Sequence, residues 1–135
     1  MAFVQLGSDA KVNVQAIDGQ HLHLVALLNE LHDAMLRQED SDTLGRRLSD
    51  LIDATRAHFR YEEGLMSQHD YSEYASHKAQ HEKLMQHIES LAEGFRRGDS
   101  LLSFGVILDL KGWAMTHIEQ SDKPLGAFLN ENKVF

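Results

Sequence analysis

The stretch YASHKAQHEKLMQHIESLAEGF, residues 74–95, carries the clearest periodicity in the chain. Its larger side chains recur at alternating spacings of three and four residues: Tyr74, His77, His81, Leu84, Ile88, Leu91 and Phe95. This period places them on one face of an α-helix, as in the seam of a helical bundle. Two of them are histidines, at positions where a bundle normally buries leucine or isoleucine. The stretch therefore predicts a bundle with polar chemistry inside it.

Three other segments show the same helical period. We therefore expect an all-α chain folded as an antiparallel, up-down-up-down four-helix bundle with an N-terminal extended arm. The first helix is expected to run from Gly19 to Arg37, and Pro124 is expected to end the fourth. The predicted N-caps are polar side chains at the helix starts: Asp18, Ser41 or Asp42, Asp70 with Glu73 in a capping box, and Asp99 or Ser100.

Residues 1–135 are expected to form a single domain with three parts. Residues 1–18 would form the arm, residues 19–122 the four-helix bundle, and residues 123–135 a short C-terminal tail. The tail carries Leu125, Phe128 and Leu129, which we expect to pack across the end of the bundle.

The composition excludes several classes of function. The net charge of −8 argues against nucleic acid as a partner, because phosphate binding requires a basic surface. The chain has no cysteine, which excludes disulfides, thiolate zinc sites and iron–sulfur clusters. Its apolar runs are too short to cross a bilayer, and its N-terminus lacks a signal-peptide pattern. We therefore expect no direct membrane insertion and a cytoplasmic location.

Histidines and carboxylates recur on the buried faces of the predicted helices. The members of the pairs His58/Glu62 and His77/His81 are four residues apart, so each pair can hold a metal ion from one helix face. A single pair is weak evidence, because hydrogen-bonded core or boundary histidines show the same spacing. Several polar groups on bundle seams are costly to bury, however, and bound metal would satisfy them together. The candidate ligands are His21, His58, Glu62, His77, His81, His117 and Asp122.

Asp122 is the ambiguous member of this set. It follows His117 by five residues, which is about 140° around an ideal helix. Both side chains reach one site only if the helix is distorted, and a widened turn before Pro124 would bring them together. The remaining histidines are better interpreted as surface or boundary residues: His23, His32, His69 and His87.

The donor types indicate which metal the site would bind. Imidazole nitrogens combined with carboxylate oxygens favour iron, with manganese or zinc as alternatives. Five imidazoles and two carboxylates suit two metal ions that are bridged by the carboxylates. With an oxo or hydroxo bridge added, these donors fill all but one position of two octahedral ions. A small exogenous ligand would bind at that open position.

Four short motifs contain the candidate ligands: IDGQH at 17–21, HFRYEE at 58–63, HKAQH at 77–81 and HIEQSD at 117–122. In order and separation these motifs resemble those of the bacteriohemerythrins, the bacterial members of the hemerythrin family, and the resemblance spans nearly the whole chain. It implies a non-heme di-iron centre in which two iron ions share a bridging oxo or hydroxo group. The resemblance also includes Asp122 among the ligands, because the family ends its last helix with a His-x-x-x-x-Asp segment. Glu62 and Asp122 would bridge the two ions as well.

The resemblance also divides the histidines between the two irons. His77, His81 and His117 would bind one iron, which is then coordinatively full. His21 and His58 would bind the other iron, which keeps a vacant position for O2. The implied function is reversible dioxygen binding, for O2 sensing, storage or transport, rather than that of an enzyme. Azide, NO or other small anions would be further ligands of the open iron.

Two questions stay open at this point. The alternative function is that of a di-iron enzyme: an oxidase, a peroxidase or a nitric-oxide-handling protein. Family domains also occur fused to chemotaxis receptors, so the chain could be the sensing part of a longer signalling protein. We expect an apolar pocket beside the open iron, widened by the small Ala114. The candidates to line it are Leu24, Leu28, Phe59, Trp113 and Ile118, with plain core packing as their alternative role.

Overall fold

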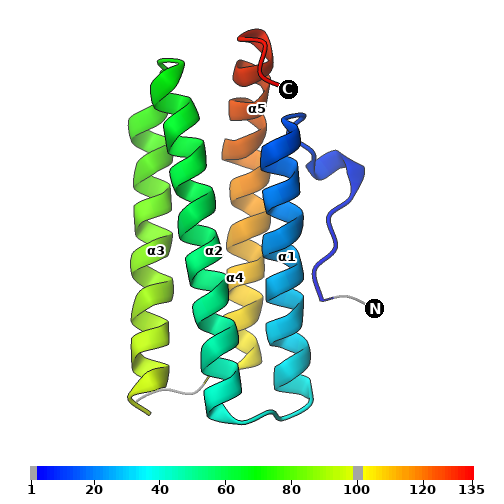
Figure 1. Cartoon of the computed structure of the whole chain (residues 1–135), viewed down its shortest axis with the longest axis vertical. Helices are drawn as coiled ribbons and strands as arrows, with labels where there is room; N and C mark the ends of the chain where they lie inside the picture. The colour runs from blue at the N-terminus through cyan, green and yellow to red at the C-terminus, as the bar shows by residue number, and fades with distance from the viewer. Residues whose placement is uncertain (1–2, 99–101) are drawn as a thin grey trace.

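Four long helical rods lie side by side, and the N-terminal arm passes along the outer side of the first (Figure 1). The computed structural model describes residues 3–98 and 102–135. The predicted antiparallel four-helix bundle is confirmed. No helix in the described ranges is both long enough and apolar enough to span a membrane. The elements are η1 (Ser8–Ala10), α1 (Gln15–Leu36), α2 (Ser41–Gln68), α3 (Tyr74–Arg96), α4 (Phe104–His117), the π-helical segment η2 (Ile118–Asp122) and α5 (Lys123–Glu131).

The prediction that Asp18 caps the first helix is wrong. α1 begins one turn earlier, at Gln15, because Ile17 is fully buried and brings this extra turn into the core. Asp18 instead ties the arm to α1. Its carboxylate accepts hydrogen bonds from the backbone N–H groups of Val12, at 2.8 Å, and Asn13, at 3.1 Å. The arm therefore ends before residue 15 and not at residue 18.

α2 is capped one residue earlier than predicted. Asp40 has the extended backbone of an N-cap (φ −68°, ψ 165°), and its carboxylate accepts a hydrogen bond from the N–H of Thr43 at 2.8 Å. The predicted alternatives, Ser41 and Asp42, lie within the first turn. Because consecutive residues here can all cap a helix, the sequence alone does not select the boundary.

The capping box predicted from Asp70 and Glu73 does not form. α3 does begin at Tyr74, but the side chain of Glu73 makes no capping hydrogen bond, and Asp70 has a positive φ of 55° in the preceding turn. α4 is capped by Ser103, whose hydroxyl accepts a hydrogen bond from the N–H three residues further on. The caps predicted at residues 99 and 100 lie outside the described residues.

Pro124 does not end the fourth helix, contrary to the prediction. It lies in the first turn of α5, where its missing N–H removes no necessary hydrogen bond. In Figure 1, α4 and α5 form one continuous rod. The predicted tail is therefore largely helical. As predicted, Leu125, Phe128 and Leu129 pack at the end of the bundle.

The core consists of two apolar clusters. The larger cluster includes Leu28, Leu48, Phe59, Leu84, Ile88 and Leu110. The smaller one is built from Val12, Val14, Ile17, Met66, Leu125 and Leu129. Along each rod, the candidate metal ligands fall between the residues of these two clusters. They therefore form a buried polar layer with apolar packing above and below it.

Gly126 of α5 lies against the arm with no room for a side chain. A β-carbon at this position would overlap the backbone carbonyl of Val12 and come within 2.8 Å of its Cβ. We expect Gly126→Ala to lower the free energy of unfolding by about 1–3 kcal/mol, because backbone and not a flexible side chain must move. The matched control is Gly112→Ala in α4, where a Cβ meets nothing within 4 Å. That change should raise the stability by about 1 kcal/mol.

Equilibrium urea denaturation measures both variants. A Gly126→Ala variant as stable as the parent would contradict the close packing of α5 on the arm.

Candidate metal centre

The structure brings all seven predicted ligands into one buried cluster. Their donor atoms form two groups, each with atoms within 4.8 Å of one another. The three-histidine group contains His77, His81, His117, Glu62 and Asp122, and the two-histidine group contains His21, His58, Glu62 and Asp122. All seven residues are at most 6% exposed. Glu62 and Asp122 belong to both groups.

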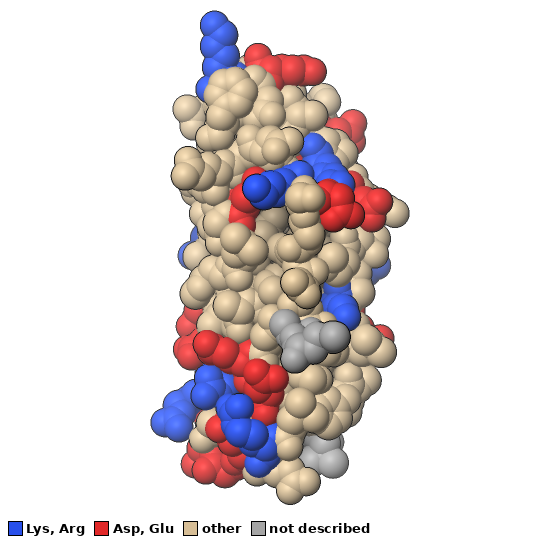
Figure 2. Space-filling view, turned by 90° about the vertical axis from the view of Figure 1, so that its right-hand side faces the viewer, with Lys and Arg blue, Asp and Glu red and all other residues tan. Residues whose placement is uncertain are grey.

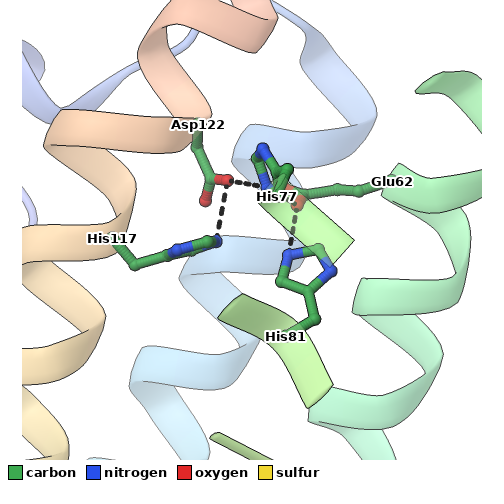
Figure 3. A group of neighbouring side chains, drawn as sticks. All are labelled: Glu62, His77, His81, His117 and Asp122. Atoms are coloured by element: carbon green, nitrogen blue, oxygen red, sulfur yellow. Dashed lines mark hydrogen bonds and ion pairs between the residues drawn. The ribbon is translucent and has the colours of Figure 1, made fainter. Parts of the chain in front are cut away.

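Each rod of the bundle contributes to this cluster. His21 comes from α1, His58 and Glu62 from α2, and His77 and His81 from α3. The fourth rod supplies the last histidine, at the end of α4, and the aspartate at the end of η2. Figure 3 shows how the members of the three-histidine group converge from three rods.

The predicted widened turn joins His117 to Asp122. Between them the backbone forms the π-helical segment η2, and the N–H of Lys123 bonds to the carbonyl of Ile118, five residues earlier. This wider turn moves Asp122 onto the inner face of the rod. Its Oδ1 lies 3.2 Å from Nε2 of His117. The geometric ambiguity of Asp122 is thus resolved by a local change of helix type.

Glu62 divides its two oxygens between the two groups. Its Oε1 lies 3.2 Å from Nε2 of His77 and 3.1 Å from Nε2 of His81. Its Oε2 lies 3.1 Å from Nε2 of His58 and 3.8 Å from Nε2 of His21. One oxygen thus faces each group, which is the arrangement that a bridging carboxylate requires.

Asp122 divides its oxygens in the same way. Oδ1 faces the three-histidine group, 3.1 Å from Nε2 of His77 and 3.2 Å from Nε2 of His117. Oδ2 lies 3.1 Å from Nε2 of His21. All five imidazoles present Nε2 to the shared carboxylates.

Three of the imidazoles are held in place through their outer nitrogens. Nδ1 of His58 contacts Oε1 of Gln20 at 2.6 Å, and Nδ1 of His81 contacts Oε2 of Glu63 at 2.9 Å. Nδ1 of His117 lies 3.0 Å from Oε1 of Gln80, which also accepts a hydrogen bond from Ser121. With Nδ1 donating to these oxygens, Nε2 keeps its lone pair free for a metal ion.

These outer acceptors were missed by the sequence prediction, although the signal was present. Gln20, Glu63 and Gln80 are polar residues, not predicted as ligands, within the motifs IDGQH, HFRYEE and HKAQH. Each directly precedes or follows a ligand in sequence. Residues adjacent to a ligand on a helix point to a different side, and only the packed bundle shows that these three turn back toward a neighbouring imidazole.

Several of the donor atoms lack the hydrogen bonds that buried polar atoms normally make. Within the described residues, the buried side-chain atoms without a hydrogen-bond partner include Nε2 of His21, His81 and His117, Oε2 of Glu62, and both oxygens of Asp122. They face one another closely but without hydrogen-bond geometry. Such groups are costly to bury unless a third centre satisfies them. A cation between them would do so, and the donor set therefore fits metal ions.

The buried carboxylates and imidazoles shift one another's pKa. Burial lowers the pKa of His21, but the carboxylates of Asp122 and Glu62 outweigh this and raise it to about 9. The pKa of His77 is also raised to about 9 for the same reasons. Burial favours the neutral acids, yet the surrounding imidazoles hold the pKa of both Glu62 and Asp122 below the usual range. Both carboxylates are therefore anionic, the state that binds cations.

An apolar cavity of about 90 Å³ reaches the two-histidine side of the cluster. His21 and His58 both line it, together with His117 and Asp122, whereas His77 and His81 do not. The predicted pocket residues are all confirmed as part of its wall: Leu24, Leu28, Phe59, Trp113, Ala114 and Ile118. The two groups of candidate ligands therefore differ in their access to the cavity, which gives a small ligand space mainly beside His21 and His58.

The four other histidines lie outside the cluster. His23 and His87 are exposed, and His69 is half-buried near the end of α2. His32 is also half-buried and stacks on the ring of Phe3. Their interpretation as surface or boundary residues is confirmed.

We expect Glu63 to fix the orientation of His81. Glu63→Leu removes the acceptor of the Nδ1 hydrogen bond, so metal affinity should fall by about 10–100-fold. Glu63→Gln keeps an acceptor oxygen and should retain most of the affinity. Competition against a chelator of known affinity measures both variants. Equal affinities for the leucine and glutamine variants would show that the contact with His81 has no orienting role.

The fold and the cluster together define a class: a helical bundle that encloses a histidine–carboxylate site able to hold metal ions. The chain matches the family described as "Hemerythrin HHE cation binding domain" over residues 12–129. This match covers most of the chain, and the chain therefore belongs to the hemerythrin family.

Similar proteins and structures agree with this assignment. The chain is 32% identical over 118 residues to a bacteriohemerythrin of Methylococcus capsulatus, covering 87% of this chain and 89% of the relative. It is 30% identical over 126 residues to a bacteriohemerythrin of Pseudomonas aeruginosa, covering 90% and 78%. The crystal structure of a wild-type hemerythrin superposes with a TM-score of 0.89 at 29% identity, covering 93% of this chain and 97% of that one.

Proposed function

We propose that this protein binds O2 reversibly at a non-heme di-iron centre held by the seven clustered ligands. The observation that carries the proposal is the division of both shared carboxylates between a three-histidine and a two-histidine group. Glu62 and Asp122 would bridge the iron ions, together with an oxo or hydroxo group. The cavity supports a vacant ligand position on the iron that His21 and His58 would hold.

The residues around the cavity favour a carrier or sensor over an enzyme. The iron pair would supply the electrons for O2 binding, and the chain must then prevent further reaction. Reduction beyond reversible binding requires protons, and the two polar wall residues Thr55 and Lys111, which are not proposed ligands, already donate hydrogen bonds to backbone carbonyls. Thr55 donates its hydroxyl proton to the carbonyl of Leu51 at 2.7 Å, and Lys111 donates to the carbonyl of Phe3 at 3.0 Å. The rest of the wall is apolar and helps to exclude water.

The decisive test is a cycle of oxygenation on the iron-loaded protein. The fully reduced protein is exposed to O2 and then flushed with argon, while metal analysis gives the iron content per chain. We expect about two irons per chain and a visible absorption band that appears with O2 and disappears without it. Rapid irreversible oxidation with substrate turnover would instead indicate an oxidase, peroxidase or nitric-oxide-handling enzyme. A preparation that retains zinc alone in the presence of iron would contradict both functions.

The biological use of the bound O2 is a separate part of the proposal. Sensing, storage and transport all require reversible binding, and a sensing role would place this domain beside a signalling module in a longer chain. Azide, NO and small anions are expected to compete with O2, because the same cavity gives them access to the same position. Competition by azide against O2 tests this shared position.

We expect Ala114→Leu to slow autoxidation. Ala114 lines the cavity, and a leucine there fills part of its volume and leaves less room for water or anions beside the iron. The reduced protein in air should lose reversible O2 binding more slowly, by roughly 2–10-fold. The matched control is Ala127→Leu on the exposed side of α5, away from the cavity. An unchanged rate of loss in the Ala114 variant would show that water does not reach the iron through this part of the cavity.

A further inference from the structure

The N-terminal arm forms one wall of the apolar cavity. The buried side chain of Val4 lines it, whereas the other lining residues belong to the four rods. Figure 1 shows the arm along the outer side of α1. Figure 2 views the face on which the arm lies, and the middle of this face carries few charged side chains. This part of the cavity wall is therefore formed by a segment that is neither helix nor strand.

Two side chains fasten this wall to the bundle. Asn29 of α1 makes a double hydrogen bond to Val4: its Oδ1 accepts from the backbone N–H at 2.7 Å, and its Nδ2 donates to the backbone carbonyl at 2.9 Å. Lys111 of α4 donates from Nζ to the carbonyl of Phe3 at 3.0 Å, and its ammonium lies 4.9 Å from the centre of the Phe3 ring. The arm is thus fastened from both neighbouring rods.

Such a wall can open without disturbing the ligands. Residues 3–6 have no regular secondary structure. They are held by these side-chain hydrogen bonds and not by the repeated backbone hydrogen bonds that stabilise the helical rods. Segments with few hydrogen bonds open locally at a small fraction of the cost of global unfolding. The metal ligands, by contrast, lie on long helices with continuous backbone hydrogen bonding.

We propose that the arm at Phe3–Val4 is the gate through which small ligands reach the cavity, and that Asn29 and Lys111 determine how often it opens. The proposal deepens the proposed function, because the gate would control O2 access to the iron held by His21 and His58. Neither Asn29 nor Lys111 is a metal ligand. Both are positioning residues that act through the arm.

The test uses Trp113, the single tryptophan of the chain, which lines the cavity. Its ring stacks on that of His117, with 4.6 Å between the ring centroids. In the zinc-loaded protein, quenching of the room-temperature phosphorescence of Trp113 by dissolved O2 measures how readily O2 enters the cavity. Lys111→Met and Asn29→Ala should each increase quenching by dissolved O2 at least about twofold, because each removes hydrogen bonds that close the gate. In the oxidised di-iron protein, azide should associate faster by a similar factor.

Three controls separate gating from general loosening. Lys111→Arg keeps a cationic donor and should restore the parent rates. Lys78→Met removes a lysine that also lies over a ring, that of Tyr74. Neither residue lines the cavity, so this variant should change nothing. Iodide, unlike azide, cannot take up a proton and enter an apolar cavity as a neutral acid, so it reports only the outer edge of Trp113, and its quenching should stay unchanged in every variant.

Two outcomes would overturn the proposal. One is unchanged O2 quenching and azide association in variants whose Val4 amide exchanges faster with solvent, because the arm would then open without admitting ligand. The other is an equal rise in iodide and O2 quenching, which would indicate loosening of the whole bundle. The zinc-loaded measurement needs neither iron nor reversible O2 binding. A failure of the gate is therefore distinguishable from a failure of the proposed function.

Discussion

Glu62→Gln is expected to abolish the two-metal site while leaving the bundle folded. The carboxylate of Glu62 is fully buried and lies within 4 Å of Nε2 of His21, His58, His77 and His81. An amide has the same size but offers one neutral oxygen, so it cannot bridge two cations. Substituting a residue that only hydrogen-bonds to a metal ligand lowers metal affinity by up to about 100-fold. Because Glu62 is itself a proposed ligand, the affinity for the second metal ion should fall by more than this.

The neighbouring residue provides a matched control for this change. Glu63→Gln makes the same substitution one position further along α2, where the carboxylate contacts Nδ1, the outer nitrogen of His81. Iron analysis after dialysis should give about two irons per chain for this control, and at most one for the Glu62 variant. Circular dichroism confirms that both variants remain helical. Two tightly bound irons in Glu62→Gln would show that this carboxylate is not a bridge.

Removing the metal should lower the melting temperature of the protein by more than about 10 °C at neutral pH. Ions bound only by the folded state stabilise it by about 4 kcal/mol at a thousandfold excess over the dissociation constant. For a domain of this size, each 1 kcal/mol corresponds to a few degrees. Without metal, the polar layer between the two apolar clusters is held only by contacts between its own carboxylates and imidazoles. The stabilisation that bound ions would add to the folded state is then lost.

The metal-free protein should also become sensitive to alkaline pH. His21 and His77 have folded-state pKa values of about 9, raised from 6.5, because their protonated rings face anionic carboxylates. Their contribution to stability is therefore fully present below pH 6.5 and is lost as the pH rises through about 9. Bound metal replaces these protons. The metal-loaded protein should show no such loss in this window.

Calorimetry of chelated and metal-loaded protein between pH 6 and 9.5 measures this difference. His87→Gln, at an exposed position on α3, is the control and should leave the pH dependence unchanged. Parallel melting temperatures for the two forms across the whole range would show that His21 and His77 do not interact with the carboxylates in the metal-free protein.

Most of the fold followed from periodicity, because seam positions record which side chains are buried. The alternating pattern from Tyr74 to Phe95 predicted α3 closely, and the polar residues on the seams predicted which side chains converge. The helix starts were less predictable. Asp40, Ser41 and Asp42 are chemically equivalent as N-caps. Which of them caps α2 depends on the residue at which the packed helix begins.

The remaining errors and omissions arise from tertiary contacts. A proline reads as a stop signal, yet Pro124 lies in the first turn of a further helix that apolar packing against the arm stabilises. Gln20, Glu63 and Gln80 look like ordinary surface residues, since their partners lie on other rods. The distinction between the two groups of histidines came from the family resemblance. Periodicity alone places all five on buried seams without dividing them.

The shared carboxylates would make the two proposed metal positions thermodynamically dependent on each other. An ion bound by the three-histidine group would orient one oxygen of Glu62 and one of Asp122, and their second oxygens would then already point toward His21 and His58. The second ion would find its ligands preorganised, with the entropy of ordering them already lost. Iron loading should therefore be positively cooperative, so that partly loaded preparations consist mainly of empty and doubly occupied chains.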